Sequence, residues 1–354
     1  MEQVEEQAAA LADEETRPVS PASEFDLNAC NEMAQRLFDR VRTAVRGRDE
    51  VIELVLIALF ADGHILLEDF PGSGKTTLAK TLGEAIVDDR PAEAKGMVEL
   101  FRRIQFTPDL LPSDVTGTTV FEPNNGSFTF RPGPVFAHVV LADEINRTSP
   151  KVQSAMLEAM AEKQVTVDNV TRRLDDLFFV IATQNPLDLA GTYPLPVAQL
   201  DRFLFKVRME HIDRAAELDV LKSMRARKEG LAGQLPPVSR DEIVIARKVI
   251  EKNVHVSSMI HEALVDIANR LREDRRVLQG VSTRALVLAV PALQTRAMRH
   301  KRDHVNADDL EALLPLVFMH RIELGAGAAE GETVLKTAMK PALDRLADKQ
   351  LRHG

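Results

Sequence analysis

The spacing of apolar residues divides the chain into regions of different texture. From His64 onward, short apolar runs alternate with segments of helical spacing, which is typical of a parallel α/β sheet. The runs predict strands over His64–Glu68, Arg102–Phe106, Ala137–Ala142, Leu177–Thr183 and Leu204–Arg208. Two helices are predicted ahead of them, over Asn28–Val45 and Asp49–Asp62. The first part of the chain is therefore expected to be an α/β domain.

From about Ile212 the pattern becomes helical throughout. Apolar positions recur every three to four residues over Ala215–Arg227, Arg240–Lys252, Ser257–Arg272, Thr283–His300, Ala307–His320 and Thr333–Arg352. A smaller, all-helical domain is therefore expected to follow the sheet.

Two segments inside the α/β part have the pattern of β-hairpins. In Gly117–Pro134, the pair Asn125-Gly126 lies between alternating runs, which is the strongest short-range hairpin signal. Lys163–Leu174 repeats the arrangement around Asp168-Asn169, but without a glycine. Both segments are predicted to be insertions into the alternating pattern.

Charge is distributed unevenly along the chain. The formal net charge is −9, and most of it lies in residues 1–25, where seven acidic side chains accompany the single Arg17. We expect this segment to be a solvated, disordered tail, although an acidic docking arm is an alternative. The nearly neutral remainder argues against nucleic-acid binding as a function, even though Arg296–His304 is locally basic.

Composition also bears on the compartment. A single cysteine, Cys30, excludes an internal disulfide framework and a cysteine-based zinc site. The amino-terminal residues lack the basic and apolar segments of a signal peptide. The most apolar run, Val51–Ala61, contains Glu53 and is too short to cross a bilayer. A cytoplasmic protein without membrane insertion is expected.

The stretch HILLEDFPGSGKTTLAK, residues 64–80, places a glycine-containing turn between a predicted strand and a predicted helix. That is the context of a phosphate-binding loop, although Asp69 stands where the general pattern has glycine. Gly72 and Gly74 leave room for phosphate beside backbone N–H groups at a helix start. Lys75 would reach the β- and γ-phosphates of ATP, and the Thr76 hydroxyl would bind Mg²⁺. The predicted loop residues are Pro71, Gly72, Ser73, Gly74, Lys75, Thr76 and Thr77.

Two later strands end in polar residues that suit ATP hydrolysis. Asp143-Glu144 follows a buried strand, so Asp143 would hold Mg²⁺ and Glu144 would polarise the attacking water. Asn185, after the next apolar strand, would orient that water. Each feature alone has a structural reading, as a chance turn, a solvated carboxylate pair or a turn asparagine. Their order along the chain favours the nucleotide site.

With these motifs in place, the chain resembles the MoxR family of AAA+ ATPases. The resemblance covers nearly all of residues 30–322. It is carried by the runs LLEDFPGSGKT, LPSDVTGTTVF, FRPGPVFAHVVLADEINR, SAMLEAMAEKQVTVD, FFVIATQNP, LPVAQLDRFLFK and GVSTRA. It implies a core of P-loop type over 26–210 with a parallel sheet and two hairpin insertions, and an all-α lid over 211–325. Composition and helical spacing add the disordered acidic tail over 1–25 and a linker and helix over 326–354.

The resemblance also implies roles for particular residues. Arg202 in QLDRF matches the arginine finger that reaches a neighbouring subunit's γ-phosphate, with a simple ion pair to Asp201 as the alternative. Arg284 in GVSTRA matches the lid arginine that senses γ-phosphate, in its own subunit or in a neighbour. Further matches are the adenine-contacting segment with Val45 and Gly47, a second interface arginine, Arg147, and a link from Gln105 to Glu144.

The function that the resemblance implies is protein remodelling. A Mg²⁺-dependent ATPase would assemble as a homo-oligomeric ring, expected to be a hexamer, and act with a von Willebrand factor A domain partner on an unidentified client. In the hairpins, Phe121, Phe128 and Phe130 would either contact the client or pack on one another. A nucleic-acid motor and a metal-chelatase motor subunit use a similar core and are the alternatives. A nucleotide-binding scaffold without turnover is disfavoured by the intact set of catalytic residues.

Overall fold

The computed structural model describes residues 25–68, 73–124, 126–185, 191–228, 235–325 and 330–353. Its centre is a five-stranded sheet in the order β10-β1-β9-β6-β3, with every neighbouring pair parallel. The strands are β1 (Ile65–Glu68), β3 (Glu99–Gln105), β6 (Ala137–Asp143), β9 (Phe179–Gln184) and β10 (Phe205–Arg208). All of the predicted strands form, and the expected parallel α/β fold is confirmed.

The central strands are buried on both faces because apolar residues occupy successive positions. In β6, Val139 and Leu141 belong to one hydrophobic cluster, whereas Val140 and Ala142 belong to the other. The first cluster includes residues of α2 (Leu27–Ala44), α3 (Asp49–Phe60) and α4 (Lys75–Ala85). The second includes α7 (Pro150–Glu162). Helices therefore cover both faces, as a parallel sheet requires.

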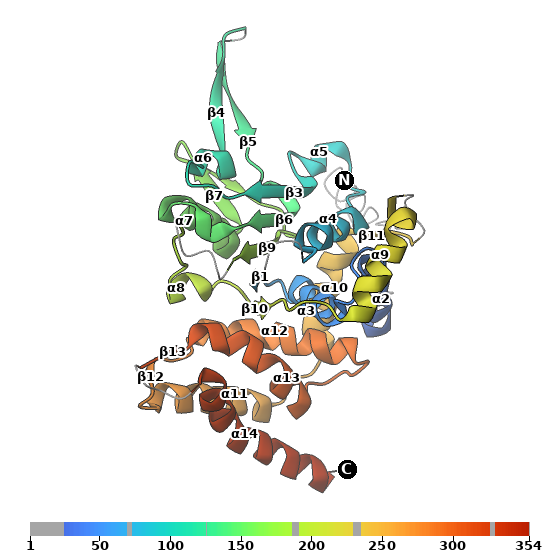
Figure 1. The fold of residues 1–354 in the computed structure, drawn as a ribbon, viewed down its shortest axis with the longest axis vertical. Coiled ribbons are helices and arrows are strands. Elements are labelled where there is room, and N and C mark those ends of the chain that lie inside the picture. The colour runs from blue at the N-terminus through green and yellow to red at the C-terminus, as the bar shows by residue number, and fades with distance from the viewer. Residues whose placement is uncertain are drawn as a thin grey trace, which may run out of the picture.

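The C-terminal part of the chain is helical, and most of it lies below the sheet in Figure 1. It contains α10 (Arg240–Asn253), α11 (Ser258–Glu273), α12 (Thr283–Arg299), α13 (Ala307–Phe318) and α14 (Gly331–His353). Side chains of Ser257, Ser282 and Asn306 cap α11, α12 and α13. The remaining helices are α5 (Ala92–Lys95), α6 (Pro112–Thr116), α8 (Val197–Leu200) and α9 (Arg214–Lys228), with 3₁₀ turns η2 (Ile145–Arg147) and η4 (Met319–Arg321). Short strands are β2 (Ile86–Val87), β11 (Val238–Ser239), β12 (Val277–Gln279) and β13 (Glu323–Leu324).

Both predicted hairpins form. The first, β4 (Gly117–Glu122) with β5 (Ser127–Pro132), projects well beyond the sheet in Figure 1. Phe121 and Phe128 pair across it with ring centroids 5.2 Å apart, yet they remain 50% and 72% exposed. Phe130 instead packs on Phe136 at the base. The three aromatic residues therefore differ in their surroundings, and client contact stays a prediction.

The second hairpin, β7 (Gln164–Val167) with β8 (Val170–Arg173), turns without glycine. Asp168 and Asn169 both adopt positive φ, at 52° and 60°, which these two residue types tolerate better than most. The Arg172 guanidinium lies 3.8 Å from the centroid of the Phe130 ring. The base of the long hairpin therefore rests against the shorter one.

A buried charged cluster ties α10 to the amino ends of the strands. His138, at the start of β6, lies 3.2 Å from Asp88, and Arg240 of α10 donates to Asp175 just ahead of β9. Arg90 bridges Asp88 and Asp175, and its hydrogen bonds hold the pKa of Asp88 well below the usual range. The first residue of α10 is thereby fixed to the α/β part of the molecule.

Candidate nucleotide site

The phosphate-loop segment joins β1 to α4. Gly74 caps α4 with φ of 95°, a left-handed conformation that favours glycine. Apart from its chain neighbours, no atom of the described residues lies within 4 Å of where its Cβ would be. Ser73 Oγ is buried without a hydrogen-bond partner. The first turn of a helix also offers backbone N–H groups to an anion. An open approach, an orphaned hydroxyl and a helix start fit bound phosphate. Asp69, Pro71 and Gly72 lie outside the described residues.

The acidic pair is fixed by a buried threonine. Asp143 ends β6, and Glu144 follows with φ of 59°. Thr183 Oγ1 of β9 donates to Asp143 Oδ1 at 2.7 Å and accepts from the Glu144 backbone N–H at 2.9 Å. One hydroxyl thus orients both acidic residues. Thr183 was not predicted from the sequence, although a threonine at the end of the apolar run FFVIA was a usable signal. It is fully buried in the structure.

Two side chains of the edge strand β3 donate hydrogen bonds to the acidic pair Asp143–Glu144. Arg103 donates to Asp143 Oδ2 from Nη2 at 2.7 Å and from Nε at 3.2 Å. Gln105 Nε2 donates to Glu144 Oε2 at 2.9 Å, so the expected link between these two side chains is present. Arg147 Nε lies 3.3 Å from the same Glu144 oxygen. In this structure each carboxylate therefore has a partner within its own chain.

Asn185 directly follows β9, which lies between β1 and β6 in the sheet. Glu68 of β1 is opposite Gln184 in the parallel register, so the carboxyl end of β1 lies beside that of β9, which Asn185 follows. Gln184 and Lys206 both bind the Glu68 carboxylate, with the lysine Nζ at 2.8 Å. Loop, acidic pair and asparagine thus meet at the carboxyl edge of the sheet, where ligands bind in open α/β folds.

The predicted adenine-contacting segment is the turn between α2 and α3. Val45 is buried, and Gly47 has φ of 67°. A Cβ on Gly47 would lie 2.5 Å from Cβ of Ala216 in α9, so this glycine allows close packing of the turn on α9. Arg46 strengthens the contact through an ion pair of 3.4 Å with Asp219. Adenine binding by this segment stays a prediction.

Arg202 and Arg284 lie in a separate cluster. Asp201 accepts from Arg321 Nε at 2.7 Å and from Ser282 Oγ, the cap of α12, at 3.1 Å. Arg202 follows Asp201, and the exposed Arg284 lies in the first turn of α12. Within the described part of the chain, neither the Arg202 nor the Arg284 guanidinium has a hydrogen bond or ion pair. The alternative ion pair of Arg202 with Asp201 is therefore absent, because Asp201 is engaged by Arg321.

Arg321 was not predicted from the sequence. Its side chain is buried and also donates to the backbone carbonyls of Phe203 and Leu204. Burial lowers the pKa of its guanidinium, and the Asp201 carboxylate opposes that shift. Arg321 thus anchors the segment that carries Arg202 to the helical region.

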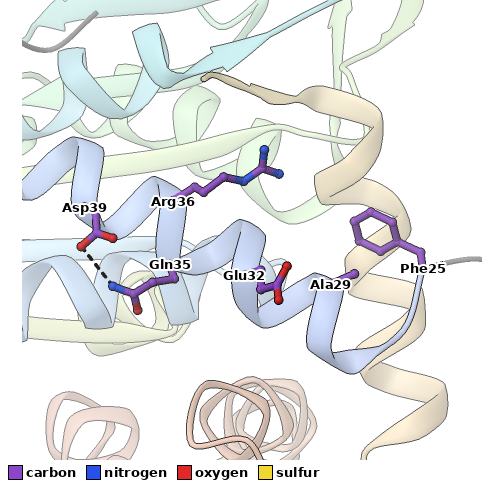
Figure 2. Close-up of a pocket in the computed structure, with 6 residues that line it drawn as sticks. All are labelled: Phe25, Ala29, Glu32, Gln35, Arg36 and Asp39. Atoms are coloured by element: carbon purple, nitrogen blue, oxygen red, sulfur yellow. Dashed lines mark hydrogen bonds between the residues drawn. The ribbon is translucent and has the colours of Figure 1, made fainter. Parts of the chain in front are cut away.

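A shallow hollow of about 550 Å³ lies along α2, away from the nucleotide site. Figure 2 shows its lining by Phe25, Ala29, Glu32, Gln35, Arg36 and Asp39. None of the predicted nucleotide-site residues lines it, so the hollow is not part of that site. No helix within the described ranges is long and apolar enough to span a membrane.

The phosphate loop, the acid pair and the five-stranded parallel sheet define a P-loop ATPase of the AAA class. Two family models agree: the ATPase family associated with various cellular activities matches residues 64–205, and the AAA lid domain matches residues 269–340. A crystal structure from Cytophaga hutchinsonii with a provisional ATPase description superposes with a TM-score of 0.77. It is 34% identical and covers 89% of this chain and 95% of its own.

Similar sequences narrow the class further. Chaperone MoxR1 of Mycobacterium tuberculosis is 32% identical over 90% of this chain and 82% of its own length. Protein MoxR of Methylorubrum extorquens is 30% identical over 82% of this chain and 88% of its own length. A Bacillus subtilis protein named YeaC is 44% identical, over 81% and 85%. The chain belongs to the MoxR family of AAA+ ATPases, as the sequence motifs predicted.

Proposed function

We propose that the chain hydrolyses ATP with Mg²⁺ at sites shared between neighbouring subunits of a hexameric ring, and that the cycle remodels partner proteins. The observation that carries this proposal is the separation of two sets of residues. The phosphate loop and the acidic pair meet at the carboxyl edge of the sheet, whereas Arg202 precedes the amino end of β10.

Within one subunit, residues 71–77 would bind the phosphates of ATP, with Lys75 on the β- and γ-phosphates. Thr76 and Asp143 offer the oxygen ligands that Mg²⁺ prefers, and the ion would neutralise charge on the phosphates when bound. Glu144 would accept the proton of the attacking water and Asn185 would orient that water. Gln105, which donates to Glu144, would relay the state of a partner to that carboxylate.

The register of the sheet supports action of Arg202 on a neighbour. Phe205 is opposite Ile65, so Arg202 precedes the amino end of β1, while the phosphate loop follows Glu68 at the other end. The strand alone spans on the order of 10 Å, more than an arginine side chain covers once it has turned toward the phosphates. Arg284 shares the Asp201–Ser282 cluster, so we assign both arginines to a neighbour's nucleotide.

The remodelling part of the proposal has a different basis. A relative is named a chaperone, and the exposed pair Phe121–Phe128 offers an apolar surface at the end of a projecting hairpin. From the family resemblance we propose a von Willebrand factor A domain protein as partner, a protein client, and action in the cytoplasm. A metal-chelatase motor role would differ only in the partner.

The test is steady-state ATP hydrolysis per subunit over a wide range of protein and Mg²⁺ concentrations. Shared sites require specific activity that rises with protein concentration as rings form, and that needs Mg²⁺. Activity that is independent of concentration while the chain stays monomeric in sedimentation would contradict the shared site. Absence of Mg²⁺-dependent hydrolysis under conditions of ring formation would contradict the enzymatic role.

A further inference from the structure

Arg103 lies on β3, the edge strand beside β6. Alternating residues of a strand point to opposite faces, so Arg103 and Gln105 share one face and Arg102 takes the other. The Arg103 side chain is 47% exposed, although its guanidinium touches the nearly buried Asp143 carboxylate, which is 10% exposed. Arg103 can therefore leave Asp143 for solvent without breaking apart a packed core.

Asp143 has both carboxylate oxygens engaged. Thr183 donates to Oδ1, and Arg103 donates twice to Oδ2. A buried carboxylate needs such compensation, because an unpaired charge in low dielectric is costly. A divalent cation held by Asp143 would likewise compensate the carboxylate charge, and it would need the same oxygen that Arg103 contacts.

We propose that Arg103 is the resident counter-cation of Asp143, and that it competes with the divalent cation for Asp143 Oδ2. This inference rests on the proposed function, in which Asp143 is a ligand of Mg²⁺. The residue acts as a positioning group: it holds the carboxylate in place before the metal–nucleotide complex arrives, and it leaves when that complex binds.

The competition also reaches Glu144. Arg103 Nη2 donates to Gln105 Oε1 at 2.6 Å, and the amide of Gln105 donates in turn to Glu144. When Arg103 leaves Asp143, the Gln105 amide also loses the donor that holds its Oε1. Metal entry at Asp143 and release of Glu144 are thereby connected through two side chains of one strand.

The experiment measures binding of a fluorescent, slowly hydrolysed ATP analogue to the full chain as Mg²⁺ is titrated. Arg103→Met removes the charge and keeps the aliphatic stem. Since partly exposed ion pairs contribute modestly, we expect the Mg²⁺ midpoint to fall about threefold. The matched control is Arg102→Met, on the opposite face of β3. Within the described residues Arg102 forms its ion pair with the exposed Glu99, so this variant should leave the midpoint unchanged.

Arg103→Lys is the second variant, because lysine keeps one charge but loses the planar pair of donors. Its midpoint should lie between those of wild type and Arg103→Met. A midpoint in either variant that equals or exceeds the wild-type value, with analogue binding intact, overturns the competition and leaves the proposed function standing. A wild-type chain that binds no analogue at any Mg²⁺ concentration overturns both.

Discussion

Two charged regions of this molecule, the acidic pair Asp143–Glu144 and the cluster around Asp201, differ in how completely their side chains are paired. At the carboxyl edge of the sheet, Asp143 and Glu144 are engaged by Arg103, Thr183, Gln105 and Arg147 of the same chain. In the second region, Arg321 and Ser282 both donate hydrogen bonds to the Asp201 carboxylate. Arg202 and Arg284 have no such partner in the described ranges. The acidic pair is therefore held within one chain, whereas the two arginine side chains are available to another molecule.

The largest effect is expected from Arg202→Ala. An arginine that stabilises the transition state of phosphoryl transfer contributes about 10³-fold or more to turnover, so hydrolysis should fall by that order. Nucleotide affinity should stay nearly unchanged, because the variant's own phosphate loop is intact. Parallel ATPase and analogue-binding measurements check this. Hydrolysis that survives in the variant would remove Arg202 from the site.

Glu144→Gln tests the acidic pair. The amide cannot accept a proton from water, so turnover should fall by about 10²- to 10⁴-fold. Analogue binding should persist, since Gln keeps a side chain of nearly the same shape. Equilibrium binding beside turnover separates the two effects. Loss of binding together with turnover would mean that Glu144 holds the site together and does not act on water.

Asp201→Asn removes the charge that faces buried Arg321. Breaking one partner of a buried pair costs about 3 kcal/mol, which denaturant unfolding would register as a lower midpoint. Ser282→Ala is the comparison variant, because it removes an uncharged donor to Asp201 together with the cap of α12 but no charge, and should cost about 1 to 2 kcal/mol. Equal effects of the two variants would show that the Arg321 charge is compensated elsewhere.

A smaller effect is expected from pH. Burial lowers the pKa of His64 to about 4, and the contact of its Nε2 with the Met160 carbonyl only partly opposes that shift. The His64 Nδ1 accepts from the Val180 N–H. The unfolded chain binds this proton from about pH 6.5 downward while the folded chain does not. Between pH 7 and pH 5 the His64 contribution should therefore lower the free energy of unfolding by about 2 kcal/mol.

His64→Gln isolates that contribution, because glutamine keeps a donor and an acceptor but does not titrate. The buried His320, whose pKa is also lowered by burial, remains in both proteins. The difference in unfolding free energy between variant and wild type should change over this pH range. A constant difference would show that His64 protonates equally in both states.

Much of the fold was readable from the sequence because its signals are local. The apolar runs located every strand of the sheet, and the helix boundaries fell within a few residues. The start of one strand was misplaced: β3 begins at Glu99 and not at the predicted Arg102. An edge strand with exposed charged residues lacks the apolar pattern that marks the buried strands.

The candidate site was readable only in part for a related reason. Lys75, Asp143 and Asn185 belong to contiguous motifs, so their chemistry could be inferred from neighbours in the chain. Thr183 and Asp143 are 40 residues apart, and Arg321 and Asp201 are 120 apart. Their pairing depends on strand register and on packing of the helical region, which a single sequence does not specify.

The most direct test of shared sites mixes two inactive variants. A Glu144→Gln subunit lacks its own water-activating group but keeps Arg202, and an Arg202→Ala subunit has the reverse defect. If Arg202 acts on a neighbour, mixed rings contain sites that combine an intact Glu144 with an intact Arg202, and ATP hydrolysis returns well above either variant alone. If hydrolysis in mixed rings, verified by co-purification of two tags, stays at the sum of the two variants, the arginine does not act across a subunit boundary.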